Sequence, residues 1–416
     1  MVSEASVSDS PLITSGRLYA EISDGGVLNT GMAIVNPNLQ TATVNFTFVD
    51  TTGQAIKTAS FAVGANQQQA VFLNQDPFQI PAGSQGAFSF TSNQPVAVIA
   101  LRGLTNERGE FLMTTLPIID RAAAAPAGIP VVPHFADGQG WTTQLLLVNP
   151  TDTAISGSVQ FFSSGQSGTA AEAISLTVNG QRTASISYTI PGGSAQKIAT
   201  SGTEPGLRSG SVRIMPAQGG GTAPAPLVVF SYKPAAFTVT EAGAAANAGT
   251  AFRMYVEASG ASGQIGSIQS GIAIANRTAT AANVTLELFD LNGAVVGTPI
   301  VLPLAGSGQT ARFITEFFPT LPASFKGVLR ITAPVEISVV GLRGHYNERL
   351  DFLVTTAQAV NENAPAATTL RVFPQLANGG GYTTKFILFS AAAGQTASGQ
   401  LRFFTQAGVP LNLLLR

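Results

Sequence analysis

Hydrophobic residues in this chain recur at every second position over short runs. The run at 44–48 has Val, Phe and Phe separated by Asn and Thr, and the run at 284–288 has Val, Leu and Leu separated by Thr and Glu. A period of two places one face of a strand in a core and the other in water. Each run ends in an Asp-x-x-Gly turn, at 50–53 and 290–293, so the pattern predicts antiparallel strands joined by tight turns.

Many further runs of this kind follow one another between turn residues. The first part of the chain has candidates at 29–35, 55–63, 67–73, 86–92, 95–102 and 110–115, and the next part has them at 142–148, 156–162, 171–177, 182–190, 208–215 and 226–232. Short strands at this density are typical of immunoglobulin-like antiparallel β-sandwiches. A barrel of similar size fits the same pattern. The fold class expected is therefore all-β.

Two motifs occur twice with one spacing. Residues 101–115 read LRGLTNERGEFLMTT and residues 342–356 read LRGHYNERLDFLVTT, which is 10 identities in 15 positions at an offset of 241. The segment GWTTQL at 140–145 recurs as GYTTKF at 381–386, again at an offset of 241. Two different motifs with the same spacing indicate a true internal repeat.

The repeat predicts two module types in the order A-B-A-B. We expect an extension or donor strand at 1–16, sandwich A1 at 17–120, sandwich B1 at 129–243, sandwich A2 at 252–360 and an incomplete sandwich B2 at 371–416. The connecting segments 121–128, 241–250 and 361–369 are rich in Ala and Pro or Gly. Connectors of this kind suggest spacers between separate beads of a rod.

The second B module is shorter than the period demands. Its equivalent of residue 243 would be residue 484, whereas the sequence given ends at Arg416. Half a sandwich leaves sheet edges and a core face uncovered. Two expectations follow: the sequence is a fragment of a longer array, or another chain donates the strands. Residues 6–14 are a candidate donor strand with weak alternation.

Composition narrows the classes of partner. Only 10% of residues are charged, 21 basic and 22 acidic, against roughly 25% in ordinary domains. Such a surface predicts no nucleic-acid partner and no anionic membrane. The chain has no cysteine and no run of about 18 apolar residues, so we expect no disulfide, thiol nucleophile or membrane span. The first sixteen residues lack a signal-peptide core, so a secreted protein would have lost its signal from this sequence.

The repeated motif concentrates the polar residues of the A modules. Its members are Arg102, Asn106, Glu107, Arg108 and Glu110 in the first copy, and Arg343, Asn347, Glu348, Arg349 and Asp351 in the second. We expect Arg–Glu pairs across each hairpin and an Asn that satisfies turn backbone, which together stabilise the loop. A contact between modules or subunits is the alternative interpretation.

No candidate catalytic or cofactor site is apparent. Trp141 and its counterpart Tyr382 are expected to be anchor aromatics, with a sugar-stacking role as the alternative. The two histidines, His134 and His345, are not kept in the other copy, and a metal site needs several convergent ligands. No Walker, nucleophile-elbow or HExxH pattern occurs. We therefore predict no enzyme activity, no metal and no cofactor.

The signatures ALRGLTNERGEFLMTTLP at 100–117 and VPHFADGQGWTTQLLLVNP at 132–150 resemble tandem immunoglobulin-like β-sandwich repeats in secreted or surface proteins of environmental bacteria. The resemblance covers nearly the whole chain and implies an extracellular, structural role in surface display, adhesion or filament assembly. It carries over no catalytic residue. Partners would be the protein itself, by head-to-tail contact or strand donation, or other surface components. An accessory carbohydrate- or ligand-binding array is the alternative.

Overall fold

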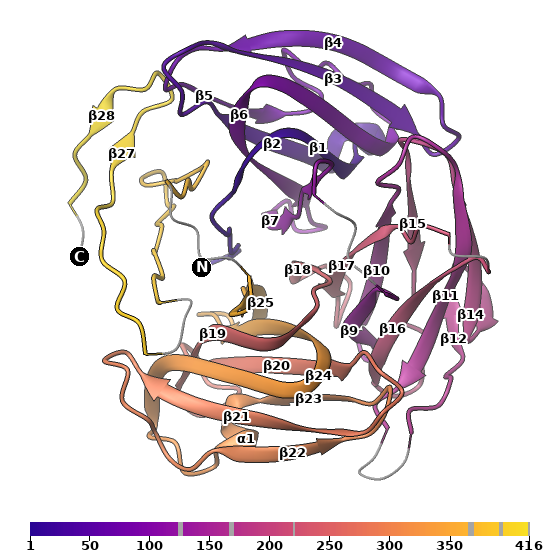
Figure 1. The fold of residues 1–416 in the computed structure, drawn as a ribbon, viewed down its shortest axis with the longest axis vertical. Coiled ribbons are helices and arrows are strands. Elements are labelled where there is room, and N and C mark those ends of the chain that lie inside the picture. The colour runs from indigo at the N-terminus through magenta and orange to yellow at the C-terminus, as the bar shows by residue number, and fades with distance from the viewer. Residues whose placement is uncertain (124–127, 166–169, 219–220, 365–369, 391–393, 415–416) are drawn as a thin grey trace.

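The computed structural model describes residues 1–123, 128–165, 170–218, 221–364, 370–390 and 394–414. Three β-sandwiches follow one another around a ring, and residues 370–390 and 394–414 lie in the fourth position, between the third sandwich and the first (Figure 1). Every pair of strands in these residues is antiparallel. The prediction of an all-β chain of antiparallel sheets is confirmed.

Sandwich A1 is made by two sheets that share one long strand. The strand β6 pairs through its first half with β3 and β1 and through its second half with β2 and β7, which gives the orders β4-β3-β6-β1-β8 and β5-β2-β6-β7. Its elements are β1 (Leu12–Glu21), η1 (Asp24–Gly26), β2 (Leu28–Val35), β3 (Ala42–Asp50), β4 (Ala55–Val63), β5 (Gln68–Phe72), β6 (Gln85–Thr105), β7 (Phe111–Leu116) and β8 (Ile119–Asp120).

The alternation predicted at 44–48 fills the core of A1. Val44, Phe46 and Phe48 are at most 2% exposed. The Phe46 ring stacks on Phe88 with centroids 5.2 Å apart and meets Phe78 edge-on at 5.3 Å, a geometry that adds to the burial of apolar area. Gly53 closes the β3–β4 turn at φ 91°, which favours glycine.

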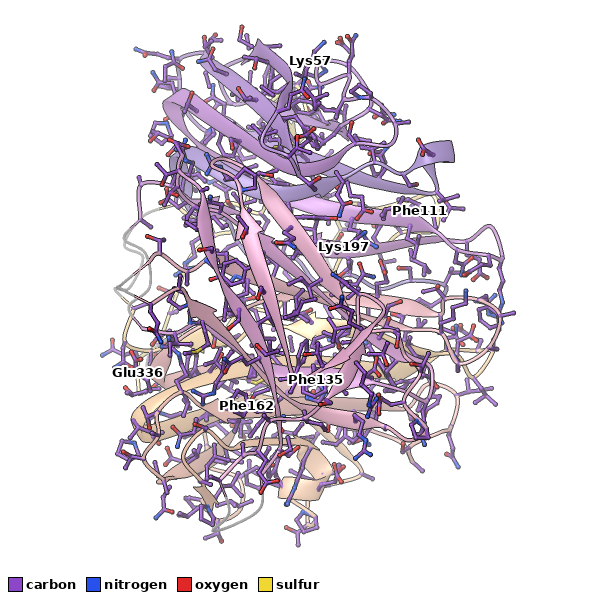
Figure 2. All side chains as sticks on the ribbon, turned by 90° about the vertical axis from the view of Figure 1, so that its right-hand side faces the viewer. Lys57, Phe111, Phe135, Phe162, Lys197 and Glu336 are labelled. Atoms are coloured by element: carbon purple, nitrogen blue, oxygen red, sulfur yellow. The ribbon has the colours of Figure 1, made fainter. Side chains whose placement is uncertain are left out.

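Sandwich B1 repeats this topology with two strands in place of β6. Its two main sheets are β14-β11-β16-β9 and β15-β10-β17-β18. Phe135 of the first sheet, labelled in Figure 2, meets Phe161 edge-on in the core. The strands are β9 (Val131–Asp137), β10 (Trp141–Val148), β11 (Ile155–Ser163), β12 (Leu176–Val178), β13 (Gln181–Thr183), β14 (Ser185–Ile190), β15 (Ala195–Ala199), β16 (Arg208–Pro216), β17 (Ala225–Tyr232) and β18 (Thr240–Ala245).

Sandwich A2 has the topology of A1, again with one long shared strand, β24. Its elements are β19 (Gly249–Ser259), β20 (Ile268–Asn276), β21 (Ala282–Asp290), β22 (Ile300–Leu304), β23 (Gln309–Phe313), α1 (Ile314–Phe317), β24 (Ser324–Tyr346), β25 (Phe352–Ala357) and β26 (Val360–Asn361). In the fourth position the described residues contain only the short pair β27 (Phe403–Phe404) and β28 (Pro410–Leu411).

The hydrophobic cores run across the module boundaries. Leu145 and Leu147 of β10 lie in the core of B1, whereas Leu146 and Val148 lie in the core of A1. Ala273 and Val340 of A2 join the core of B1 in the same way. A strand buried on both faces is apolar at every position rather than at alternate ones, which explains the run of four apolar residues in β10.

The expectation of a rod of separate beads is wrong. Sandwiches that share cores cannot move independently, because separating them would expose apolar surface. The expected spacer at 241–250 is also wrong, since β18 and the start of β19 occupy it. The expected spacers at 121–128 and 361–369 fall partly outside the described residues. No helix in the described part of the chain is long and apolar enough to cross a membrane.

Candidate functional site

The repeated polar motif lies at the centre of the ring, where four segments meet. These segments are β7 of A1, β25 of A2, β18 of B1 and the N-terminal residues 1–8, and all four lie near the middle of the view in Figure 1. We call this region the hub. Each copy of the motif contributes one hairpin to it, formed by the end of β6 with β7, or by the end of β24 with β25.

Arg102 is the most buried arginine of the hub. Its guanidinium donates to Glu241 of β18 at 2.9 Å and lies 3.4 Å from Glu21 of β1. Its side chain is 6% exposed, and those of Glu241 and Glu21 are 3% and 14% exposed. Burial opposes the charge of Arg102, but the two carboxylates keep its pKa above the usual value. Removing only one member of such a buried group leaves an uncompensated charge, which is strongly destabilising.

Arg343, the second copy of this arginine, is held in the same way. It pairs with Glu257 of β19 and, at 2.6 Å, with Glu4 of the N-terminal segment. Glu257 corresponds to Glu21 in A1, and Glu4 occupies the position that Glu241 has at the first arginine. The N-terminal segment therefore serves A2 as β18 serves A1.

The asparagine of the motif closes its turn and holds the incoming chain. Asn106 Oδ1 accepts from the backbone N–H groups of Arg108 and Glu110, both at 2.9 Å, while its Nδ2 donates to the Thr238 carbonyl at 2.8 Å. Asn347 repeats this arrangement with the Met1 carbonyl at 2.9 Å. The motif asparagine thus fixes the start of β18 in one half of the ring and the N-terminus in the other.

The adjacent glutamate binds the same two chain positions. Glu107 accepts from the Thr238 N–H at 2.7 Å and from Lys233, and Glu348 accepts from the terminal amine of Met1. Burial acts against the Glu107 charge, but these hydrogen bonds outweigh it and lower its pKa to about 2.

The remaining motif charges link the two A modules directly. Arg108 lies 3.1 Å from Asp351, and Arg349 lies 2.6 Å from Glu110, so the contact is reciprocal, like an interface between two equal subunits. The expected pairs across each hairpin do not form in the first copy. In the second copy Arg349 also contacts Asp351 at 3.1 Å. Because the hairpins face each other, most of the ion pairs run between modules.

Sequence reasoning missed the N-terminal half of the hub, although a signal for it is present. Residues 2–5 read VSEA and residues 239–242 read VTEA, at an offset of 237. The contacts correspond: Ser3 Oγ accepts from the Met113 N–H at 3.1 Å, as Thr240 Oγ1 does from the Val354 N–H. The offset differs from 241 because the two A modules differ by loop insertions.

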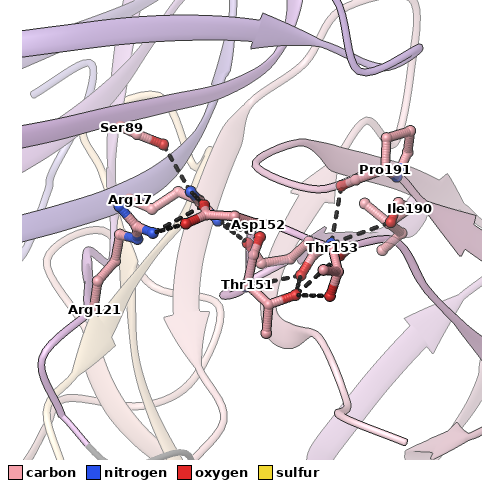
Figure 3. Close-up of polar contacts among 9 residues, drawn as sticks. Arg17, Ser89, Arg121, Thr151, Asp152, Thr153, Ile190 and Pro191 are labelled. Carbon is pink, nitrogen blue, oxygen red and sulfur yellow. Dashed lines mark hydrogen bonds and ion pairs between the residues drawn. The ribbon is translucent and has the colours of Figure 1, made fainter.

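A second set of missed residues joins consecutive modules. Arg17 donates to the carbonyls of Asn149 and Thr151 at 2.6 and 2.8 Å and pairs with Asp152 at 2.8 Å (Figure 3). Carbonyls equivalent to that of Asn149 accept at the other junctions. Arg213 donates to the Asn276 carbonyl at 3.1 Å, and Arg253 donates to the Ser390 carbonyl at 2.9 Å. An arginine on each sandwich therefore caps the end of a strand of the next.

The predicted aromatic positions differ in their surroundings. The half-buried Trp141 stacks on Tyr232 with centroids 4.5 Å apart, and Phe352 and Tyr346 continue this row. Tyr382, the counterpart of Trp141, is 48% exposed. The row makes a partly exposed aromatic strip where B1 meets A2.

His134 lies at the same B1–A2 boundary, with Nδ1 3.3 Å from Gln309 Nε2 and Phe230 beneath it. Its counterpart Gln375 bonds to Gln68, so the two copies keep the contact with a neutral side chain. Burial lowers the pKa of His134 to about 4. The site therefore favours the neutral imidazole.

We expect His134 to make the fold sensitive to mild acid. Between pH 6.5 and about 4, His134 is protonated in the unfolded chain but stays neutral in the folded protein. The free energy of unfolding therefore falls as the pH falls through this range. Replacing His134 with Gln should remove roughly 2 kcal/mol of this pH dependence. Urea unfolding at pH 7 and pH 4.5 measures it. His345→Gln is the control, and an equal flattening there would contradict the assignment.

No group of three or more His, Asp or Glu side chains in the described residues is placed to hold a metal ion. No protein-family model matches the chain, and no curated protein matches it. Among solved structures, the Anabaena sensory rhodopsin transducer is 24% identical over 21% of this chain and 95% of its own, with a TM-score of 0.19. A Thermotoga maritima protein, described as 1070, is 15% identical over 26% and 96%, with a TM-score of 0.22.

Proposed function

We propose that this protein is a non-catalytic structural scaffold, a rigid ring of β-sandwiches that serves surface display, adhesion or assembly outside the cell. The main support for this proposal comes from what the polar residues of the repeated motif contact. All ten of its singled-out polar residues, from Arg102 to Asp351, bind other parts of the ring or close their own turn. Catalytic groups, by contrast, are held at a concave site where a substrate can reach them.

The sparse charge supports the same role. With 10% charged residues and a net charge of −1, copies of the ring repel one another little, which favours ordered association. The buried ion pairs of the hub fix the relative positions of the sandwiches rather than steering ligands. An extracellular or surface location belongs to this proposal and follows from the resemblance of the repeat.

A second candidate is carbohydrate binding at the aromatic strip. The stacked pair Trp141–Tyr232 with Phe352 beside it offers an extended aromatic surface, and aromatic faces are the usual platforms for sugar rings. The described residues contain one such strip, because Tyr382 does not stack on an aromatic residue among them.

One set of measurements separates the two roles. For the scaffold, protease treatment of intact source cells should remove the protein, and electron microscopy of the cell surface should show regular ring units. For carbohydrate binding, glycan-array signal should disappear in Trp141→Ala and persist in the matched control Tyr382→Ala. Protein that resists protease until the cells are lysed, or catalytic turnover abolished by one substitution in the hub, would refute the scaffold.

A further inference from the structure

We propose that two copies of this chain associate through β14 of sandwich B1, edge to edge and antiparallel, about a two-fold axis. The sheet β14-β11-β16-β9 then continues from one copy into the other. This inference rests on the assembly role proposed above and names the partner, a second copy of the same chain. β14 lies on the outer rim of B1, on the opposite side of the ring from β27 and β28 (Figure 1).

The equivalent sheets of the three sandwiches end in β4, β14 and β22, and β14 alone among these strands lacks a feature that hinders pairing. β4 contains Lys57 and shares a register shift with β3. β22 has five residues, one of which is Pro303. β14 reads SISYTI, without charge, proline or glycine. Lysine, proline and bulges commonly keep edge strands from pairing, so β14 is open to an added strand.

The outward backbone groups of β14 are free at two residues. The Phe161 N–H of β11 donates to the Ala184 carbonyl at 3.0 Å. Backbone groups alternate in direction along an antiparallel strand, so those of residues 184, 186, 188 and 190 face β11, and those of Ser187 and Thr189 face away. No hydrogen bond to these outward groups occurs within the described residues.

The strand that carries these groups is held firmly by its inner face. Tyr188 and Ile190 are 2% and 0% exposed, and the Tyr188 hydroxyl donates to the Met215 carbonyl at 3.3 Å. The side chains of Ser187 and Thr189 are exposed. A strand that is already ordered loses little conformational freedom when a second strand pairs with it.

The free groups specify the register of the pair. If Ser187 of each copy lies opposite Thr189 of the other, four hydrogen bonds form and every free outward group is used. The two-fold axis then passes beside Tyr188. A pair centred on Ser187 would place Thr189 opposite Ser185, whose N–H and carbonyl are already bonded to Thr183 Oγ1 at 3.1 and 2.6 Å.

Charge favours a second copy as the partner. Residues 183–194 contain no charged side chain, so two identical strands meet without like charges at the contact. The chain as a whole has 21 basic and 22 acidic residues, so two rings repel each other little as they approach. A charged partner strand would find no opposite charge in this segment.

Light scattering tests the association. The purified chain should be a monomer at about 1 µM and form dimers toward about 1 mM, because a contact between two edge strands is small and small interfaces are weak. Replacing both Ser187 and Thr189 with Lys should keep the protein monomeric, since each cross-strand pair would then hold two like charges. A monomer at every concentration, or a Lys variant that dimerises like the unchanged chain, would overturn the proposal.

Opposite charges provide the control for this result. Replacing Ser187 and Thr189 with Glu should also give a monomer, whereas a mixture of the Lys and Glu variants should associate at least roughly tenfold more tightly than either alone. The matched variant Ser60→Lys with Ala62→Lys puts the same charges on exposed positions of β4 and should dimerise like the unchanged chain. Failure of the mixture to associate, or loss of the dimer in the β4 variant, would contradict pairing through β14.

Disulfide trapping tests the register, because the chain has no cysteine of its own. A mixture of Ser187→Cys and Thr189→Cys chains should cross-link, since a hydrogen-bonded antiparallel pair has its Cα atoms about 5.5 Å apart, which suits a disulfide. Either variant alone should cross-link poorly, because its two cysteines would be diagonal neighbours about 7–8 Å apart. Equal cross-linking of Ser187→Cys alone and of the mixture would refute this register.

The two proposals can fail separately. Absence of the dimer would remove the β14 contact and leave the result of protease treatment of intact cells unchanged. Protein that resists protease until the cells are lysed would refute the surface scaffold, whereas the dimer and its response to the Lys and Glu variants would still be measured in solution.

Discussion

Replacing Arg102 with Met should lower the free energy of unfolding by about 3–5 kcal/mol, because it leaves buried carboxylates without their cation. Glu241 is 3% exposed and Glu21 14% exposed, so water cannot replace the guanidinium. Lys197 still pairs with Glu21 at 2.6 Å, which leaves Glu241 as the main source of the loss. Urea unfolding at pH 7, followed by the fluorescence of the single tryptophan, measures the effect.

Two variants show whether the loss arises from the buried charge. Lys233→Met removes an ion pair whose side chains are 46% and 44% exposed and should cost less than about 1 kcal/mol. Adding Glu241→Gln to Arg102→Met should recover a large part of the loss, since the orphaned charge is then removed. A cost for Arg102→Met no greater than that for Lys233→Met would show that the hub does not depend on this arginine.

Replacing Asn149 with Ala should cost about 3 kcal/mol, since several buried backbone groups lose their partner at once. The side chain is 0% exposed, and its Nδ2 donates to the carbonyls of Thr153, Ile190 and Pro191 at 2.7, 3.1 and 2.9 Å. Its Oδ1 accepts from the Thr151 N–H at 2.9 Å. The turn that receives Arg17 is therefore built on this one amide.

The matched control is Asn93→Ala, an exposed asparagine whose Oδ1 accepts from the Thr43 N–H at 2.7 Å. It should cost less than about 1 kcal/mol. Hydrogen exchange of the Thr151 amide should accelerate in Asn149→Ala and stay unchanged in the control, which reports on the A1–B1 junction itself. Equal costs for the two substitutions, with Thr151 protected in both, would contradict the assigned role.

The sequence alone determined the class of the fold and the repeat. Alternation at 44–48 and the Asp-x-x-Gly turns are properties of neighbouring residues, so they predict strands without knowledge of their partners. Most candidate strands lie within a residue or two of those observed. The candidates at 86–92 and 95–102, however, are parts of the single strand β6, the candidate at 182–190 is divided between β13 and β14, and at 171–177 the regular strand is only β12. The repeated motif also singled out ten polar residues that lie together in the hub.

Only the tertiary structure decided what those polar residues do. The residue that meets Arg108 or Arg102 is set by closure of the ring, which brings Asp351 and Glu241 to them from more than a hundred positions away. A local sequence pattern does not specify which distant residue forms the ion pair. The nearest opposite charge in the sequence therefore predicts the wrong partner. The similarity between VSEA and VTEA can be seen in the sequence. Its role becomes clear only in the structure, where residues 1–8 and β18 occupy equivalent positions between the two hairpins. Strand formation is local and therefore readable from the chain, whereas the ring depends on contacts between distant residues.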